Sequence, residues 1–294
     1  MKNSRTFFVF VIFSLTIYPV LSACDESGKV IAEVDDTIIE EVDPYKDIKE
    51  WFSYLCSPEL GGRYSGSEGI KKAVVFLSDV IGDSDSLEIT TFFAKDTIKM
   101  HNLIFHVKGL SDSLFVVGAH YDAFGYLTSS ALPGADDNMS GVAVLLGLIK
   151  RLQSKEFSPY YSLDICLFDG EEMGRFGSKH YLENCKNGIK MYINVDTCGK
   201  NEGGIGIYCD INNPFLKDDF KGVFQGVKTA IVDYRSERYT TDCQYFAYRS
   251  IPYVSIMNDS SSDYLHSYND DVSHIFFERI SFISDDLEAY LRTR

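Results

Sequence analysis

The chain has 294 residues and predicts an α/β fold, a three-layer α/β/α sandwich with a mostly parallel, mixed central sheet. Segments with apolar residues at helical spacing alternate along the chain with short apolar runs that are typical of buried strands. From residue 44 onward, no stretch rich in proline, glycine or serine interrupts this alternation, and no internal repeat occurs. We therefore expect one domain over residues 44–294.

Helices are expected where apolar residues recur three or four positions apart, over residues 44–56, 67–81, 137–152, 177–185, 212–227 and 273–293. Strands are expected in the apolar runs at residues 87–94, 101–109, 112–122, 161–170, 189–199 and 251–257. Either Asn138 or Ser140 would cap the third helix. The first two strands follow each other directly, so we expect them to add antiparallel edges to the sheet.

The charge balance argues against polyanionic partners. Acidic side chains outnumber basic ones by 43 to 28, which argues against nucleic acid or an anionic membrane surface. A hydrophobic fraction of 45% is ordinary for a globular protein with a full core. Solubility is a sufficient explanation of the excess acid.

The N-terminus predicts export from a bacterial cytoplasm. Lys2 and Arg5 precede an apolar run too short to span a membrane with its own flanks, and the residues LSAC, ending at Cys24, follow it. This order resembles the lipobox of bacterial lipoproteins, and an ordinary signal peptide with an incidental cysteine is the alternative. We expect a signal peptide over residues 1–23 and a lipidated Cys24 with an acidic tether over residues 24–43. The protein would then be anchored to a membrane and face the periplasm or the cell surface.

Six further cysteines leave the disulfide pattern open. Outside the cytoplasm an even number permits disulfides, but the pairing does not follow from the sequence. No CxxC pair or Cys/His spacing indicates a structural zinc site. The cysteines are Cys56, Cys166, Cys185, Cys198, Cys209 and Cys243.

Acids and histidines lie at the ends of the predicted strands, where α/β sheets build their sites, or on loops. They are His120, Asp122, Asp136, Asp137, Glu171, Glu172, Asp196 and His266. Singly, each has a structural explanation as a hydrogen-bonded rim residue, a turn residue or a solvated acid. The adjacent glutamates would repel each other at a partly buried strand end, unless a positive charge lies between them and the rest of the site.

Together, two histidines and three carboxylates can complete the coordination of two metal ions if one carboxylate bridges them. A further carboxylate remains free as a general base. Imidazole and carboxylate without thiolate suit Zn²⁺ and also tolerate Mn²⁺ or Co²⁺.

Six segments, in this order, resemble the M28 family of zinc aminopeptidases: AHYD, PGADDNMSG, FDGEEMGRFGSKHY, NVDTCG, TDCQYFAYRSIPYV and HSYND. The upstream LGGRYSGSEGIKKAVVFL is similar to the segment that opens that family's domain. The resemblance implies two Zn²⁺ per chain and hydrolysis of the N-terminal peptide bond of peptides with a free N-terminus. It also implies the metal ligands, which are His120 and Asp196 for one zinc, Glu172 and His266 for the other, and Asp137 as the bridge.

The same resemblance assigns the remaining residues. Glu171 would be the general base, Asp122 would orient His120, and Asp136 would be a neighbour that binds no metal. Tyr239 or Tyr245 would stabilise the oxyanion, and the sequence does not choose between them. Arg63 is expected to hold its loop rather than to bind substrate.

Two other functions remain open at this point. Glutaminyl cyclases share the fold and act on one zinc, and they would not require both His120 and Asp196 as ligands. An inactive surface lipoprotein that binds peptides would have lost the base or a ligand, whereas Glu171 and the whole ligand set are present. The oligomeric state and the preferred N-terminal residue do not follow from the sequence.

Overall fold

The computed structural model describes residues 43–82, 85–127, 130–154, 158–236 and 241–294. The predicted signal peptide, Cys24 and all but the last residue of the predicted tether lie outside this part of the chain, and so does Tyr239. No helix within the described ranges is long and apolar enough to cross a membrane.

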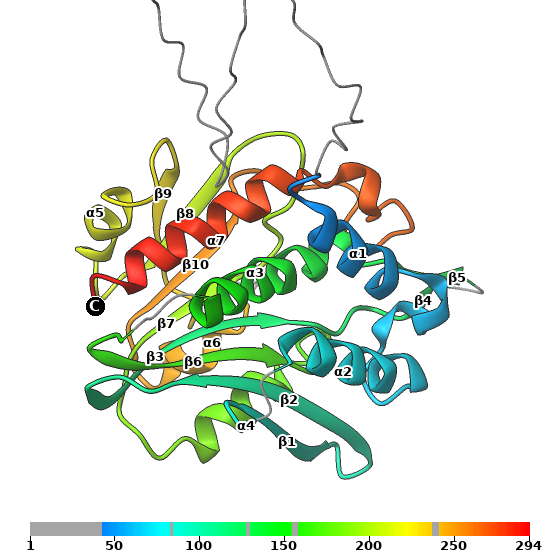
Figure 1. Ribbon diagram of the computed structural model, residues 1–294, viewed down its shortest axis with the longest axis horizontal. Coiled ribbons are helices and arrows are strands. Elements are labelled where there is room, and N and C mark those ends of the chain that lie inside the picture. Colours follow the sequence, from blue (N-terminus) through cyan, green and yellow to red (C-terminus); the bar gives the residue numbers. More distant parts are fainter. Residues whose placement is uncertain (1–42, 83–84, 128–129, 155–157, 237–240) are drawn as a thin grey trace, which may run out of the picture. The chain divides into compact units, whose positions relative to one another are not determined.

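In the described part of the chain, eight strands form the central sheet. They are β1 (Leu87–Ala94), β2 (Ile98–Val107), β3 (Ser111–His120), β6 (Tyr161–Phe168), β7 (Ile189–Val195), β8 (Ile205–Asp210), β9 (Lys228–Val232) and β10 (Tyr253–Asn258). Their order is β1-β2-β6-β3-β7-β10-β8-β9 (Figure 1). The four strands β6, β3, β7 and β10 run parallel in the middle, whereas β1 and β2 form an antiparallel edge and β8 runs antiparallel to β10. The predicted fold class and its antiparallel edge are therefore confirmed.

Helices cover both faces of this sheet (Figure 1). One layer contains α1 (Lys46–Leu55), α2 (Glu68–Ile81), α3 (Gly141–Ser154) and α7 (Phe277–Leu291), and the other contains α4 (Phe176–Asn184) and α6 (Cys243–Tyr248). Successive side chains of a strand point to opposite faces, so β3 contributes Phe115 and Val117 to the first core and Leu114 and Val116 to the second. This alternation makes each strand a wall between two hydrophobic cores.

Helix α3 is buried along most of its length between the sheet and α7. A Cβ atom at Gly147 would lie 2.8 Å from Ser284 Oγ, so the glycine is what permits this close approach. Ser284 Oγ also donates a hydrogen bond to the Val144 carbonyl oxygen at 2.9 Å. The cap is Asn138 rather than Ser140, because Asn138 Oδ1 accepts the Gly141 N–H at 2.9 Å.

Several elements differ from the sequence-based expectation. The helix expected at residues 212–227 is confined to α5 (Leu216–Lys221), and the one expected from residue 137 begins at Gly141 after a π-helical turn, Ala135–Ser140. The strands β8 and β9 and the helix α6 were not predicted at all. These are short elements of five or six residues, in which neither the helical nor the strand period can repeat often enough to be recognised.

Arg63 is fully buried and ties its loop to other parts of the backbone, as expected. Its guanidinium donates hydrogen bonds to the carbonyl oxygens of Leu55, Tyr121, Pro133 and Gly134 at 2.6 to 2.9 Å. All six cysteines of the described ranges are free thiols. The buried Cys166 is one of them, so the core of this domain is held by packing and hydrogen bonds.

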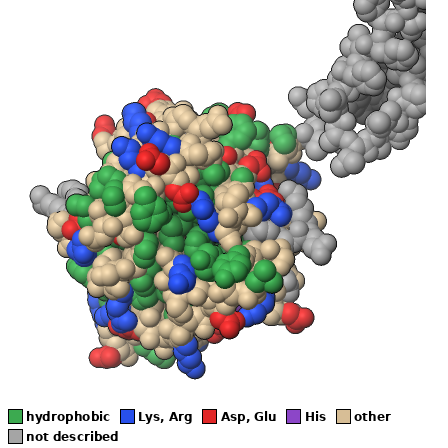
Figure 2. Space-filling model, turned by 90° about the vertical axis from the view of Figure 1, so that its left-hand side faces the viewer, with side chains coloured by type: hydrophobic (Ala, Val, Ile, Leu, Met, Phe, Trp, Pro, Cys, Tyr) green, Lys and Arg blue, Asp and Glu red, His purple; other side chains and the backbone are tan. Residues whose placement is uncertain are grey.

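The surface on the side of α5 and β9 is mixed in composition. Hydrophobic side chains lie there among scattered lysines, arginines and acids (Figure 2). Ile211, Phe215 and Ile231 are exposed hydrophobic residues of this part of the chain. Single exposed apolar side chains between charges are ordinary on protein surfaces, and they mark no site by themselves.

Candidate metal centre and active site

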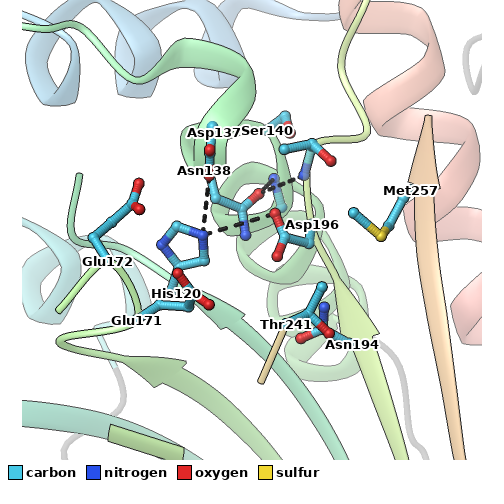
Figure 3. A network of polar contacts seen from close by, with 12 residues as sticks. His120, Asp137, Asn138, Ser140, Glu171, Glu172, Asn194, Asp196, Thr241 and Met257 are labelled. Carbon is cyan, nitrogen blue, oxygen red and sulfur yellow. Dashed lines mark hydrogen bonds and ion pairs between the residues drawn. The ribbon is translucent and has the colours of Figure 1, made fainter. Parts of the chain in front are cut away.

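The predicted metal ligands converge beyond the carboxyl ends of the parallel strands, and Figure 3 shows His120, Asp137, Glu172 and Asp196 among them. Asp137 lies between the two imidazoles, with Oδ1 3.1 Å from His120 Nε2 and Oδ2 2.9 Å from His266 Nε2. Asp196 Oδ1 is 3.7 Å from His120 Nε2, and Glu172 Oε2 is 3.7 Å from His266 Nε2. Each histidine therefore has its own second carboxylate, and Asp137 is shared between the two groups.

The strand register explains this convergence. In the parallel pair β3 and β7, Gly118 lies opposite Asn194, so His120 and Asp196 leave the sheet at the same level. In the pair β3 and β6, His120 lies opposite Phe168, which places the turn with Glu171 beside the histidine. Residues that lie 76 positions apart meet because parallel strands end at the same edge of a sheet.

A second aspartate holds the loop that carries Asp137. The carboxylate of Asp270 accepts the N–H groups of Asp136 and Asp137 at 2.7 and 3.1 Å. On the other side, Asn138 Nδ2 donates to the Val195 carbonyl oxygen at 2.9 Å. These contacts fix the loop between the end of β7 and the segment that contains His266. The role of Asp270 was not predicted, although it lies in the HSYND segment.

Asp136 points away from the two histidines. Its Oδ1 accepts the Gly199 N–H and its Oδ2 accepts Asn258 Nδ2, both at 2.8 Å. Burial raises the pKa of Asp136 to about 6. The residue is a hydrogen-bond anchor between its own loop and the segments that contain Gly199 and Asn258.

Asp122 lies behind His120 and also supports the glutamate turn. His120 Nδ1 is 3.1 Å from the carbonyl oxygen of Asp122 and 3.5 Å from its carboxylate Oδ1, so the backbone oxygen is the nearer acceptor. The carboxylate instead accepts the N–H groups of Glu171 at 3.0 Å and of Glu172 at 3.2 Å. The sequence predicted the first of these roles and gave no sign of the second.

The two glutamates are desolvated and poorly partnered. Burial raises the pKa of Glu171 well above its usual range, with the charge of His120 opposing it, and its Oε1 has Arg175 Nη1 at 3.6 Å. Burial and the charge of Asp137 raise the pKa of Glu172, whose Oε1 has no hydrogen-bond partner. A carboxylate oxygen buried without a partner is unfavourable unless a cation compensates it.

Comparison with known proteins identifies the family. The model of peptidase family M28 matches residues 102–287. The chain belongs to peptidase family M28. The family expected from the sequence motifs is therefore confirmed.

Relatives of this M28 protein include a leupeptin-inactivating enzyme and leucine aminopeptidases. Leupeptin-inactivating enzyme 1 of Streptomyces exfoliatus is 29% identical over 195 residues, which cover 63% of this chain and 42% of that protein. A probable leucine aminopeptidase of Arthroderma otae is 25% identical over 237 residues, 74% of this chain and 64% of that one. The chain thus spans less than two thirds of the length of either relative.

Solved structures share the fold. The LapA aminopeptidase of Legionella pneumophila has a TM-score of 0.67 at 17% identity, covering 84% of this chain and 70% of its own. A glutaminyl cyclase of Porphyromonas gingivalis has a TM-score of 0.67 at 18% identity, covering 83% of this chain and 97% of its own. A Zn-dependent exopeptidase of Parabacteroides distasonis has a TM-score of 0.65 at 18% identity, covering 84% of this chain and 98% of its own.

The site of this M28 protein fits divalent cations. Single ligand atoms of His120, Asp137 and Glu172 lie within 4.8 Å of one another. Among the described residues that line the cavity, of about 580 Å³, Arg175 is the single lysine or arginine, against four carboxylates. Metal ions of the kind that imidazole and carboxylate bind would compensate this group of buried carboxylates.

The structure describes one of the two tyrosines that were expected to stabilise the oxyanion. Tyr239 lies outside the described residues. Tyr245 does not line the cavity, and its hydroxyl is 3.5 Å from the Gly174 carbonyl oxygen. Tyr234, which the sequence did not suggest, lines the cavity together with Met257.

One further acid near the site was missed. Asp242 is fully buried, its Oδ1 accepts a hydrogen bond from Ser178 Oγ, and its Oδ2 has no partner. Burial raises the pKa of Asp242 to about 7, and the charge of His120 opposes this shift. Its place in the TDCQYF segment was visible in the sequence, but nothing there showed that the side chain faces inward.

Proposed function

We propose that this protein is an aminopeptidase that uses two zinc ions to hydrolyse the N-terminal peptide bond of peptides. The observation that carries the proposal is the position of Asp137, which offers one carboxylate oxygen to His120 and the other to His266. A carboxylate with one oxygen toward each of two ligand groups suits a pair of metal ions.

The ligands would divide into two sets around Asp137. His120 and Asp196 would hold one zinc, and Glu172 and His266 would hold the other. When bound, the two ions would supply Lewis-acid activation of a water molecule and of the scissile carbonyl group. The contact of His120 Nδ1 with the Asp122 carbonyl oxygen supports this assignment, because it leaves Nε2 directed at the other ligands.

Glu171 would act as the general base. Its backbone is held by Asp122, while its side chain has only the long contact with Arg175. A buried carboxylate with few partners accepts a proton readily. Glu171 would take a proton from the attacking water and then donate it to the departing amine. Tyr239 remains a candidate for the oxyanion.

The cavity suggests where the N-terminal residue would bind. Its acidic side chains would attract the positively charged α-amine of the substrate. Met257, Leu265 and Tyr234 form an apolar part of the lining, which would accept the first side chain of the peptide. The substrates would therefore be peptides with a free N-terminus and an apolar first residue.

The proposal is tested by metal content and substrate specificity together. Purified protein should contain two zincs per chain and release the first residue from a panel of aminoacyl amides, and a chelator should abolish the release. One zinc per chain together with cyclisation of N-terminal glutamine would identify a glutaminyl cyclase instead. Peptide binding without turnover would identify an inactive binding protein.

We also propose that the mature protein is a lipoprotein. The sequence LSAC after an apolar run supports a signal peptide over residues 1–23 and a lipid anchor on Cys24. A lipid anchor would hold the peptidase at a membrane, facing the periplasm or the outside of the cell, where peptides would be its substrates.

A further inference from the structure

A second cavity, of about 620 Å³, adjoins the candidate active site. Its wall carries three exposed aromatic side chains, Tyr64, Phe124 and Tyr126, which we call the aromatic groove. Their exposed fractions are 43%, 42% and 60%. Aromatic rings clustered in one hollow are typical of binding surfaces, because each ring offers a large apolar area with few rotatable bonds.

Two glycines leave the space in which the tyrosines of the aromatic groove pack. A Cβ atom at Gly61 would lie 2.9 Å from Tyr126 Oη, and one at Gly125 would lie 2.8 Å from Tyr64 Cβ. Both glycines have positive φ, 57° and 84°, so a larger residue would be strained there as well as crowded. Each tyrosine thus lies against a glycine of the opposite loop, and its ring is positioned before any ligand binds.

The aromatic groove lies next to the predicted metal ligands, because Phe124 lines the groove and also contacts His266. The Phe124 ring lies 4.1 Å, centroid to centroid, from the His266 ring. A small hollow between them shares Phe124 with the groove, and Glu172 and His266 with the active-site cavity. Met257, Leu265 and Tyr234 line the active-site cavity and do not line the groove.

The charges at the rim are balanced. Lys72 Nζ lies 2.7 Å from Glu59 Oε1, and Lys71 Nζ lies 2.5 Å from Glu68 Oε1. Exposed pairs of this kind contribute little energy, but they leave the groove without a net charge that would select an ionic ligand. Apolar and aromatic side chains are the ligands that fit it.

We propose that the aromatic groove binds the residues of a peptide that follow the scissile bond. The inference rests on the proposed aminopeptidase function, in which the first residue occupies the cavity with Met257 and Leu265. The rest of the peptide must then leave the site, and the groove begins beside His266. The preferred substrates are therefore peptides of three or more residues with apolar or aromatic side chains at the second and third positions.

Kinetics on substrates that differ only beyond the scissile bond test this directly. We would compare leucinamide, Leu-Gly-Gly-amide and Leu-Phe-Phe-amide on the wild type and on the double variant Tyr64→Ser/Tyr126→Ser. The wild type should have a higher kcat/KM on Leu-Phe-Phe-amide than on Leu-Gly-Gly-amide. In the double variant the ratio of these two values should fall about tenfold, mainly because KM for Leu-Phe-Phe-amide rises, since each aromatic contact contributes a few-fold in affinity. The variant's kcat/KM on leucinamide should stay within twofold of the wild type.

Two matched variants control the comparison. Tyr126→Phe keeps the ring and should keep the preference. Tyr248→Ser removes a similarly exposed tyrosine, 56% exposed and outside the groove lining, and should change nothing. Anisotropy of Leu-Phe-Phe-Lys, labelled with fluorescein on the lysine, should report about tenfold weaker binding when the double variant is placed in a Glu171→Gln background.

The outcomes separate the two proposals. If the wild type releases leucine from none of the three amides, the aminopeptidase function is wrong. If it hydrolyses all three and the double variant changes neither the preference nor the peptide affinity, the groove inference is wrong and the function stands. A wild-type dimer that the double variant converts to a monomer, without a kinetic effect, would assign the groove to a second copy of the chain and overturn the inference.

Discussion

Asp122 Oδ1 accepts a hydrogen bond from the backbone N–H of Glu171 at 3.0 Å, 49 residues further along the chain. The other oxygen of the same carboxylate accepts the N–H of Glu172. Asp122 is fully buried, so water does not compete for these bonds. One aspartate thus positions both the proposed general base and a proposed metal ligand.

The substitution Asp122→Asn should lower both zinc affinity and kcat/KM by about 10–100-fold, as is usual for residues that orient metal ligands. The amide has one acceptor oxygen, so it cannot accept both N–H groups in the same way. Zinc titration and steady-state kinetics would measure the two effects. Asp112→Asn, at the exposed start of β3, is the matched control, and equal zinc affinity in both variants would contradict the positioning role.

The substitution Glu171→Gln should lower kcat by about 10²–10⁴-fold, the range for loss of a general base. The amide is similar in size but takes up no proton, so zinc content and thermal stability should stay at wild-type values. Glu183→Gln, on the exposed side of α4, should leave kcat unchanged. Wild-type turnover by Glu171→Gln would rule out this residue as the base.

Removal of the metal should destabilise the fold. The buried carboxylates of Glu172 and Asp137 repel each other, and ligand binding stabilises a native state by about 4 kcal/mol when free zinc exceeds its Kd a thousandfold. We therefore expect a chelator to lower Tm and added zinc to restore it, as followed by circular dichroism. His266→Ala should retain one zinc instead of two. An unchanged Tm in the chelator would argue against a metal at this site.

The pair formed by His106 and Asp164 should make stability depend on pH. His106 Nδ1 lies 2.7 Å from Asp164 Oδ1 and Nε2 lies 3.1 Å from Glu88 Oε2, and the hydrogen bond with Asp164 raises the pKa of His106. Because the folded pKa lies above the unfolded one, the protonated histidine stabilises the fold below about pH 6.5. This contribution is lost as the pH rises through the folded pKa.

Urea unfolding of His106→Gln would measure this effect. Since the His106 ring is 42% exposed, we expect a loss below about 1 kcal/mol at pH 6 relative to the wild type, and a smaller loss at pH 9. A larger loss at pH 9 than at pH 6 would have the wrong sign for a raised histidine pKa.

The substitution Cys24→Ala should release the protein from membranes. Lipid chains on this cysteine would supply the membrane affinity that the substitution removes. Metabolic labelling with a fatty acid and fractionation of the expressing bacterium would report the anchor. Wild-type protein that carries no label and stays in the soluble fraction would favour an ordinary cleaved signal peptide.

Much of the candidate site could be predicted because its residues occupy recognisable positions in the sequence, at the ends of apolar runs. His120 and Asp196 come directly after apolar runs and Glu171 follows one within three residues. Parallel strands bring such positions to one sheet edge wherever the strands lie in the sequence. The family resemblance then assigned which of these residues would be metal ligands and which would be the base. Even so, the sequence alone left each residue with a plain structural explanation.

Only the tertiary structure decided which residues support the site and what surrounds it. Asp270 holds the Asp137 loop through hydrogen bonds to residues more than 130 positions earlier, and Asp242 faces inward without a second partner. The aromatic groove joins Tyr64 to Phe124 and Tyr126 across two glycine-containing loops. Periodicity and motifs describe neighbours along the chain, whereas these contacts depend on the distance between side chains in the packed fold, which no local pattern encodes.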